Sequence, residues 1–122
     1  MPNFVRYKII LEAKQIIKGS LTAIILKLLE DNGRMYGYEM TKAVRENSQG
    51  KMQITEAALY PALHRLLEDG LLETEMEMAE GRMRKYYSLT KKGKKQTAEA
   101  VHALQEALAS LQLILNPKTA HG

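Results

Sequence analysis

The strongest constraint on the fold lies in residues 55–72, which predict a helix with two unlike faces. At 3.6 residues per turn, these apolar side chains fall on one face: Leu59, Ala62, Leu63, Leu66 and Leu67. The opposite face carries small, ring-shaped and basic side chains and one acid: Ala57, Pro61, His64, Arg65 and Glu68. A merely solvated helix would carry a mixture of Glu and Lys there. We therefore expect one face to pack in a core and the other to contact a partner.

Both ends of this helix have sequence signals. Thr55 can cap the start with its hydroxyl, and Glu56 suits the positive end of the helix dipole. Gly70 stands where a residue in the left-handed conformation would end the helix. Pro61 is compatible with two possible first residues of this helix, so the position of the helix start stays open. A helix from Glu56 places this proline beyond the first turn, where it removes one backbone hydrogen bond, whereas a helix from Leu59 places it in an ordinary first-turn position.

Length and composition limit the class of protein. The 122 residues predict one domain, large enough to fold around an apolar core without a metal or a disulfide. The absence of cysteine excludes disulfides, thiolate zinc sites and a cysteine nucleophile. No stretch is long and apolar enough for a secretion signal or a membrane span. We therefore expect a cytoplasmic protein with no membrane partner.

The net charge of +4 is unevenly distributed along the chain. Residues 68–80 contain six acidic side chains and no basic one, whereas residues 82–95 contain seven basic side chains and no acidic one. One explanation is pairing between neighbouring strands, for example of Glu75 or Glu77 with Arg82 or Arg84. The other explanation is an anionic partner that binds the basic segment.

The N-terminal third predicts two consecutive helices. Residues 4–18 carry apolar side chains on more than one side, so we expect a helix that is covered on two faces and meets a second subunit. Gly19 should break this helix, and Ser20 should cap the next one. The second helix has a regular core stripe: Leu21, Ile24, Ile25, Leu28 and Leu29.

The middle of the chain predicts a helix-turn-helix arrangement followed by a hairpin. A short helix is expected over residues 37–46, and a short strand over residues 51–54 leads into the helix with two faces. Beyond it, residues 72–77 and 83–89 alternate between apolar and polar side chains on either side of a loop with Gly81. This pattern is typical of a β-hairpin.

The last helix opens with lysines and continues with a leucine seam. Thr90 can cap its start, and four lysines in its first turns oppose the helix dipole, so they are available to an external anion. Apolar residues then recur with heptad spacing, at Val101, Leu104, Leu108, Leu111 and Leu115. Asn116 and Pro117 should end the helix. We expect this seam to pair with a second subunit.

Three motifs, taken in order, resemble the PadR family of bacterial transcriptional regulators. They are Leu59-Tyr60-Pro61-Ala62-Leu63-His64-Arg65-Leu66, then Gly70-Leu71-Leu72, then Gly81-Arg82-Met83-Arg84-Lys85-Tyr86-Tyr87-Ser88-Leu89-Thr90 with Gly93, and Gly37-Tyr38-Glu39 is also in place. The resemblance covers roughly residues 20 to 93. It implies a mainly α fold with a β-hairpin wing, that is, a winged helix-turn-helix domain. It also implies a homodimer and repression of a promoter that a small-molecule inducer relieves.

With this resemblance the chain divides into four parts. They are an N-terminal helix that contributes to the dimer (1–19), a winged helix-turn-helix DNA-binding domain (20–90), a C-terminal dimerisation helix (91–117) and a tail (118–122). The single short C-terminal helix resembles the compact subgroup of the family.

We expect double-stranded promoter DNA to contact the exposed helix face and the basic wing. The small residues Ala57 and Pro61 allow close approach to base edges, and arginines near the wing tip suit a narrow minor groove. Lysines would follow the DNA backbone, and tyrosine hydroxyls would reach phosphates. The predicted DNA-binding residues are Ala57, Tyr60, Pro61, His64, Arg65, Arg82, Arg84, Lys85, Tyr86, Lys91 and Lys92.

A dimer formed by the terminal helices would leave room for a small apolar or aromatic effector. The predicted pocket residues are Ile9, Ala13, Val101, Leu104 and Leu108, and a filled core without a ligand is the alternative. We predict no cofactor, metal or catalytic residue, and no enzyme activity, because the three histidines lie far apart in the sequence. The alternative function is a winged-helix protein-interaction module whose basic wing binds an acidic partner.

Overall fold

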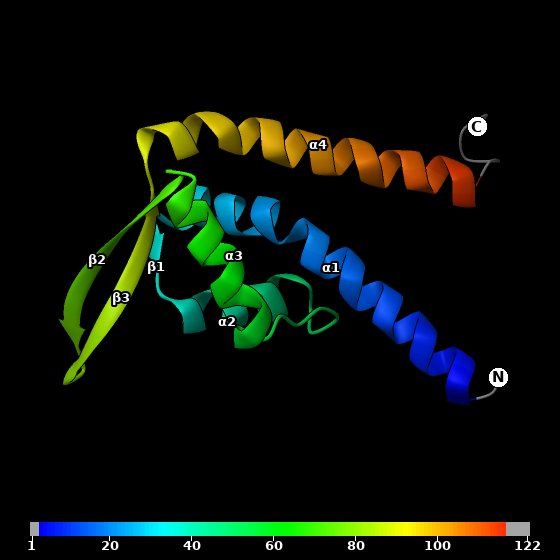
Figure 1. Cartoon of the computed structure of the whole chain (residues 1–122), viewed down its shortest axis with the longest axis horizontal. Coiled ribbons are helices and arrows are strands. Elements are labelled where there is room, and N and C mark those ends of the chain that lie inside the picture. The colour runs from blue at the N-terminus through cyan, green and yellow to red at the C-terminus, as the bar shows by residue number, and fades with distance from the viewer. Residues whose placement is uncertain (1–2, 117–122) are drawn as a thin grey trace.

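The computed structural model describes the backbone of residues 3–116 and the side chains of residues 16 and 18–116. The elements in order are α1 (Asn3–Asn32), β1 (Arg34–Met35), α2 (Gly37–Asn47), α3 (Glu56–Glu68), β2 (Leu72–Ala79), β3 (Arg82–Leu89) and α4 (Lys91–Leu115). The fold is mainly helical, with one antiparallel sheet in the strand order β1-β3-β2 (Figure 1). The helices α2 and α3 form the helix-turn-helix, and the β2–β3 hairpin forms the wing. The predicted fold class is therefore confirmed.

A single core joins α1, α2, α3 and the base of the hairpin. Its fully buried side chains are Leu21, Ile25, Leu26 and Leu29 from α1, Met40 from α2, and Leu59 and Leu63 from α3. Leu72, Tyr87 and Leu89 close it from the sheet. The predicted core stripes of α1 and α3 are thus largely confirmed, although Ile24 and Leu67 are only half-buried. Each such leucine or isoleucine contributes about 1.5–3 kcal/mol through burial.

The predicted helix break at Gly19 is wrong. The helix α1 continues through this residue, and the Ser20 hydroxyl donates to the Ile16 carbonyl at 2.9 Å instead of capping a new helix. A glycine inside a helix costs about 1 kcal/mol relative to alanine, which a long helix packed at one end can tolerate. Residues 19 and 20 therefore belong to one continuous helix.

The short strand predicted over residues 51–54 is also wrong. This segment is an extended loop, in which the Met52 amide donates to the Ser48 hydroxyl at 2.9 Å and Ile54 is buried. Its alternation therefore reflects burial without strand pairing. The third strand is β1 instead, where Arg34 is opposite Ser88 and Met35 is opposite Tyr87.

The wing is a regular hairpin, slightly longer than predicted. Leu72 pairs with Leu89 at its base and Ala79 with Arg82 at its tip, and the two turn residues Glu80 and Gly81 both have positive φ, as a type I′ turn requires. Side chains alternate between its two faces. We call the face with Thr74, Met76, Met78, Met83, Lys85 and Tyr87 the inner face, and the face with Glu73, Glu75, Glu77, Arg82, Arg84 and Tyr86 the outer face.

The helix α4 starts tightly against the wing and then leaves the body of the molecule. The Gly93 amide donates to the Thr90 hydroxyl at 3.0 Å, which confirms the predicted cap. Gly93 is packed directly on the Leu71 backbone, and a Cβ at this position would overlap the Leu71 carbonyl oxygen. Figure 1 shows α4 lying along the C-terminal part of α1, after which the two helices diverge on the side away from the wing.

Candidate nucleic-acid interface

The exposed face of α3 and the inner face of the wing enclose a groove of about 700 Å³. It is lined by Tyr60, Pro61, His64, Arg65, Leu67, Glu68, Lys85 and Tyr87. Five of the predicted DNA-binding residues are thus brought together: Tyr60, Pro61, His64, Arg65 and Lys85. Ala57 is exposed one helical turn before Pro61 on the same helix.

The geometry of α3 settles where the helix begins. The Ala58 amide donates to the Thr55 hydroxyl at 3.2 Å, so Thr55 caps the helix and Glu56 is its first residue. Pro61 therefore lies inside the helix, and the alternative start at Leu59 is wrong. Proline has no amide hydrogen, so the Ala57 carbonyl does not accept the helical hydrogen bond that residue 61 would otherwise donate. Gly70, with φ of 73°, ends the helix as predicted.

Tyr60 packs against the start of α2, where Gly37 leaves room for its ring because it has no side chain. A Cβ on Gly37 would overlap the Tyr60 hydroxyl and lie 2.9 Å from its Cζ. Burial, together with the nearby Tyr60, raises the pKa of Tyr87 on the inner face of the wing. Tyr60 therefore lies between α2 and β3, and its ring forms part of the floor of the groove. The sequence did not predict that Gly37 makes room for the Tyr60 ring.

The cations in the groove are largely free of partners from their own chain. Arg65 and Lys85 are exposed and form no ion pair with any side chain that the structure describes. His64 lies 3.6 Å from Glu68 one turn along α3, and both side chains are exposed. The groove thus presents exposed donors, of which Arg65 and Lys85 have no ion-pair partner among the described side chains.

The outer face of the wing is different, because several of its charges are paired. Arg34 on β1 binds Glu75 at 2.6 Å and also binds Glu77. Hydrogen bonding to Arg34 holds the pKa of Glu77 below its usual value. Glu77 is opposite Arg84 in the register, but neither glutamate forms an ion pair with Arg82 or Arg84, so this predicted ion pairing is wrong. A residue on a third strand neutralises the two glutamates.

Arg84 and Tyr86 belong to an aromatic and cationic cluster on this outer face. The Arg84 guanidinium lies 4.5 Å from the Tyr36 ring centroid, donates to the Tyr36 hydroxyl at 3.1 Å and binds Glu80 at 3.1 Å. Arg34 lies 4.4 Å above the Tyr86 ring, and Tyr36 and Tyr86 meet edge to face at 5.5 Å. The structure therefore places these two predicted DNA-binding residues on the side of the wing opposite the groove.

The three remaining candidates lie outside the groove. Arg82 is exposed at the tip of the wing, and Lys91 is exposed at the start of α4. Lys92 donates to the Asp69 carbonyl at 2.8 Å, so its ammonium group stabilises the C-terminal end of α3. Both lysines lie at the base of the wing, whereas Arg82 lies at its far end.

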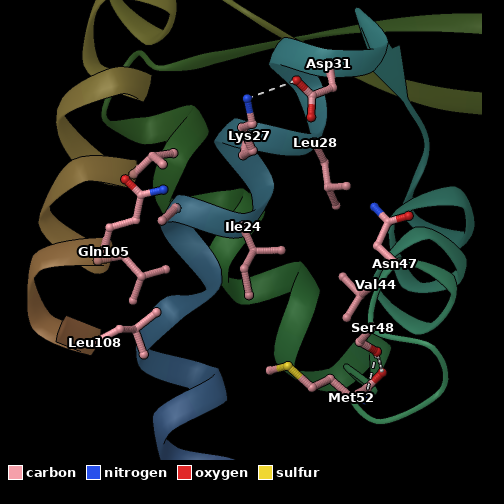
Figure 2. Close-up of a pocket in the computed structure, with 13 residues that line it drawn as sticks. Ile24, Lys27, Leu28, Asp31, Val44, Asn47, Ser48, Met52, Gln105 and Leu108 are labelled. Carbon is pink, nitrogen blue, oxygen red and sulfur yellow. Dashed lines mark hydrogen bonds and ion pairs between the residues drawn. The ribbon is translucent and has the colours of Figure 1, made fainter. Parts of the chain in front are cut away.

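A second cavity, of about 490 Å³, lies between α1, α2 and α4 (Figure 2). The predicted pocket residues Val101, Leu104 and Leu108 line it. The walls from α1, α2 and the loop after α2 were not predicted, and they include Ile24, Leu28, Val44 and Met52. Polar groups in the lining come from Asn47, Gln105 and the ion pair of Lys27 with Asp31 at 3.2 Å. The side chains of Ile9 and Ala13 fall outside the described residues.

Neither a metal cluster nor a membrane helix is found in the described part of the chain. Over these residues, no three His, Cys, Asp or Glu side chains come together as metal ligands would. None of the helices described is both long and apolar enough to cross a bilayer.

Comparison with known proteins gives a consistent picture. The family model described as the transcriptional regulator PadR-like family matches residues 25–99. The chain is 39% identical over 93 residues to "Transcriptional regulator Rv3488" of Mycobacterium tuberculosis, covering 76% of this chain and 83% of that protein. It is 34% identical over 101 residues to an uncharacterized protein of Lysinibacillus sphaericus, covering 82% and 92%.

Solved structures agree with this match. A transcriptional regulator from Clostridium thermocellum superposes with a TM-score of 0.71 at 28% identity, covering 80% of this chain and 92% of that chain. A PadR-like transcriptional regulator from Bacillus cereus gives a TM-score of 0.68 at 27% identity, covering 84% and 97%.

Proposed function

The chain belongs to the PadR-like family of transcriptional regulators rather than to a family of enzymes, and from this premise we propose how it regulates. It binds double-stranded promoter DNA through the groove between α3 and the wing, acts as a homodimer, and represses transcription until a small effector releases it. The single observation that carries this proposal is the groove itself. It gathers unpaired donors from α3 and β3 on one exposed surface.

In this proposal α3 reads the major groove. Its exposed residues are small at Ala57 and Pro61, so base edges can approach the helix closely. His64 and Arg65 then reach bases or phosphates, and Lys85 contacts the backbone from the wing. Arg82 extends the contact at the tip of the wing. Arg84 and Tyr86 instead hold the wing at its angle to the body, because the outer face already engages them.

The divergence of α1 and α4 supports a homodimer. Beyond the region where the two helices touch, α4 exposes a run of large apolar side chains: Leu108, Leu111, Leu113, Ile114 and Leu115. On α1 the Ile16 side chain is 58% exposed as well. A contiguous apolar surface of this kind marks a protein interface. Two such subunits would present their α3 helices to half-sites about 34–36 Å apart on a palindromic operator.

The cavity between α1, α2 and α4 supports an effector site. Its wall is mostly apolar, with the Lys27–Asp31 pair, Asn47 and Gln105 among its lining residues, so it suits a small apolar or aromatic compound with one polar group. An effector there contacts α4 and the helix-turn-helix at once. Its binding would change the angle between them and therefore the separation of the two α3 helices.

Fluorescence anisotropy with duplexes from the DNA upstream of the gene tests this proposal. We expect preference for one upstream site over random duplex, and an affinity that falls steeply between about 50 and 200 mM salt, because each neutralised phosphate releases counterions. Arg65→Ala should weaken binding, whereas Lys95→Ala, at an exposed position on α4, should not. A protein that sediments as a monomer, or that binds all duplexes alike, contradicts the proposal.

Thermal melting with a panel of small aromatic compounds tests the effector site. A compound that occupies the cavity raises the melting temperature with concentration and weakens DNA binding. Leu104→Trp, which fills the cavity, should abolish this response while leaving the affinity for DNA measurable.

A further inference from the structure

We propose that the wing carries an apolar DNA contact, in which Met76, Met78 and Met83 enter the minor groove next to the site that α3 reads. This inference rests on the proposed DNA binding and adds a contact that the positive charges do not provide. The three methionines project from the inner face at the far end of the hairpin. Met78 is directly opposite Met83, and Met76 is opposite Lys85.

These side chains form an exposed apolar patch. Their exposed fractions are 54% for Met76, 62% for Met78 and 55% for Met83, whereas Met35 and Met40 are buried in the core. The alternation of the strands places all three on one face, so their exposed surfaces are neighbours. Apolar side chains clustered in this way on a projecting hairpin, away from the core, indicate a binding surface.

The distribution of charge on the inner face favours a polyanion as the occupant. On the inner face, from Thr74 to the turn and back to Lys85, the only charged side chain is that of Lys85. The carboxylates of β2 all lie on the outer face, where Arg34 neutralises two of them. DNA can therefore approach the far end of the inner face without meeting a carboxylate of the wing. In the adjoining groove the acidic lining residue is Glu68 of α3, which lies 3.6 Å from His64. An acidic protein could do the same, but the methionine patch is continuous with the groove beside α3.

The length of the hairpin fits a duplex. Lys85 and Tyr87 line the groove with His64, so the inner face leads directly from α3 to the tip of the wing. From Tyr87 to Arg82 the strand spans about 17 Å at ~3.4 Å per residue. This is half of the ~34 Å helical repeat of B-form DNA. A duplex that receives α3 in its major groove thus brings the adjacent minor groove under the methionines.

Methionine is suited to this position. Its unbranched thioether adapts to an irregular surface, and minor-groove proteins use methionine among their apolar wedges. Apolar side chains pack against sugars and the edges of A·T pairs, whereas the amino group of guanine projects into the minor groove and blocks them. The patch should therefore make the protein prefer A·T pairs under the wing.

Salt-dependent binding separates this contact from the electrostatic ones. The variant with Met76→Ala, Met78→Ala and Met83→Ala should bind the operator about 10-fold more weakly, with the same dependence of affinity on salt as the wild type, because no phosphate contact is lost. Lys85→Ala should reduce the salt slope by about 1. The matched variant with leucine at the three positions should keep most of the affinity. Circular dichroism and melting temperature verify that each variant is folded.

Base replacement provides the second test. Changing A·T pairs under the wing to G·C should weaken wild-type binding several-fold, and I·C pairs, which lack the guanine amino group, should restore it. The triple alanine variant should respond to neither change.

Wild-type affinity in the triple alanine variant, or no rescue by I·C, overturns the inference while leaving the proposed function intact. A variant that changes oligomeric state instead of affinity also overturns it, because the patch would then join two copies. Failure of the wild type to bind any operator rejects the proposed function itself.

Discussion

Arg84 and Lys85 are neighbours in the sequence, but they differ in almost every other respect. Arg84 is on the outer face, where its side chain is 23% exposed, lies over Tyr36 and binds Glu80. Lys85 is on the inner face beside α3, where no described side chain forms an ion pair with it. On the outer face Glu75, Glu77 and Arg84 have ion-pair partners, whereas on the inner face Lys85 has none among the described side chains. A basic segment can therefore contain both structural and ligand-binding cations, and strand alternation separates them.

The largest effect should come from the surface that the inner face shares with α3. Arg65→Glu places a carboxylate in the groove, removes one donor and repels phosphates, so we expect DNA affinity to fall at least ~100-fold. The melting temperature should change little, because Arg65 is exposed. Lys95→Glu has the same charge change on α4 and should have a far smaller effect. Equal losses in the two variants would show that net charge, and not the groove, governs binding.

Gly37→Ala should have the next largest effect, because it disturbs the floor of the groove. The new methyl group would collide with the Tyr60 ring and hydroxyl, and overpacking of this kind costs about 1–3 kcal/mol. Denaturant unfolding measures the loss. Adding Tyr60→Phe removes the hydroxyl and should recover part of the stability. If the double variant is no more stable than Gly37→Ala alone, the contact between these two residues is not the cause.

Much of this arrangement can be predicted from local sequence signals. Thr55 and Gly70 mark the two ends of α3, and the alternation around Gly81 predicts the hairpin and already assigns Arg84 and Lys85 to opposite faces. These signals are short-range, so one sequence suffices to find them.

The elements that were missed depend on distant parts of the chain. The strand β1 has only two residues, Arg34 and Met35, which is too short to show alternation, and Arg34 pairs with a glutamate 41 residues away. Gly19 does not end α1, because the residues after it continue the helix on into the core. In both cases tertiary packing overrides the local preference.

Alanine substitution of each of the two neighbours, Arg84 and Lys85, tests the comparison directly. Arg84→Ala removes the contacts with Tyr36 and Glu80, so we expect a melting temperature lower by a few degrees and little change in the salt dependence of DNA binding. Lys85→Ala should do the reverse, leaving the melting temperature unchanged and reducing the salt slope by about 1. Calorimetry and anisotropy measure the two quantities. If the two variants behave alike, the faces of the wing do not have separate roles.

The smallest effect concerns the pH dependence of the outer face. Hydrogen bonding to Arg34 lowers the pKa of Glu77 from its usual 4.5 in the folded state. A carboxyl whose folded pKa is depressed stabilises the fold fully above its unfolded pKa, and this stabilisation is lost as the pH falls through the folded pKa. Arg34→Gln should therefore lower the melting temperature slightly at pH ~7, and the difference from the wild type should shrink below pH ~4.5 as Glu77 becomes protonated in both proteins.

Lys85→Gln on the inner face serves as the control and should show no such convergence, because Lys85 has no carboxylate partner among the described side chains. A difference between Arg34→Gln and the wild type that stays constant from pH ~7 to ~3 would mean that Arg34 stabilises the wing through its stacking on Tyr86, and not through its charge.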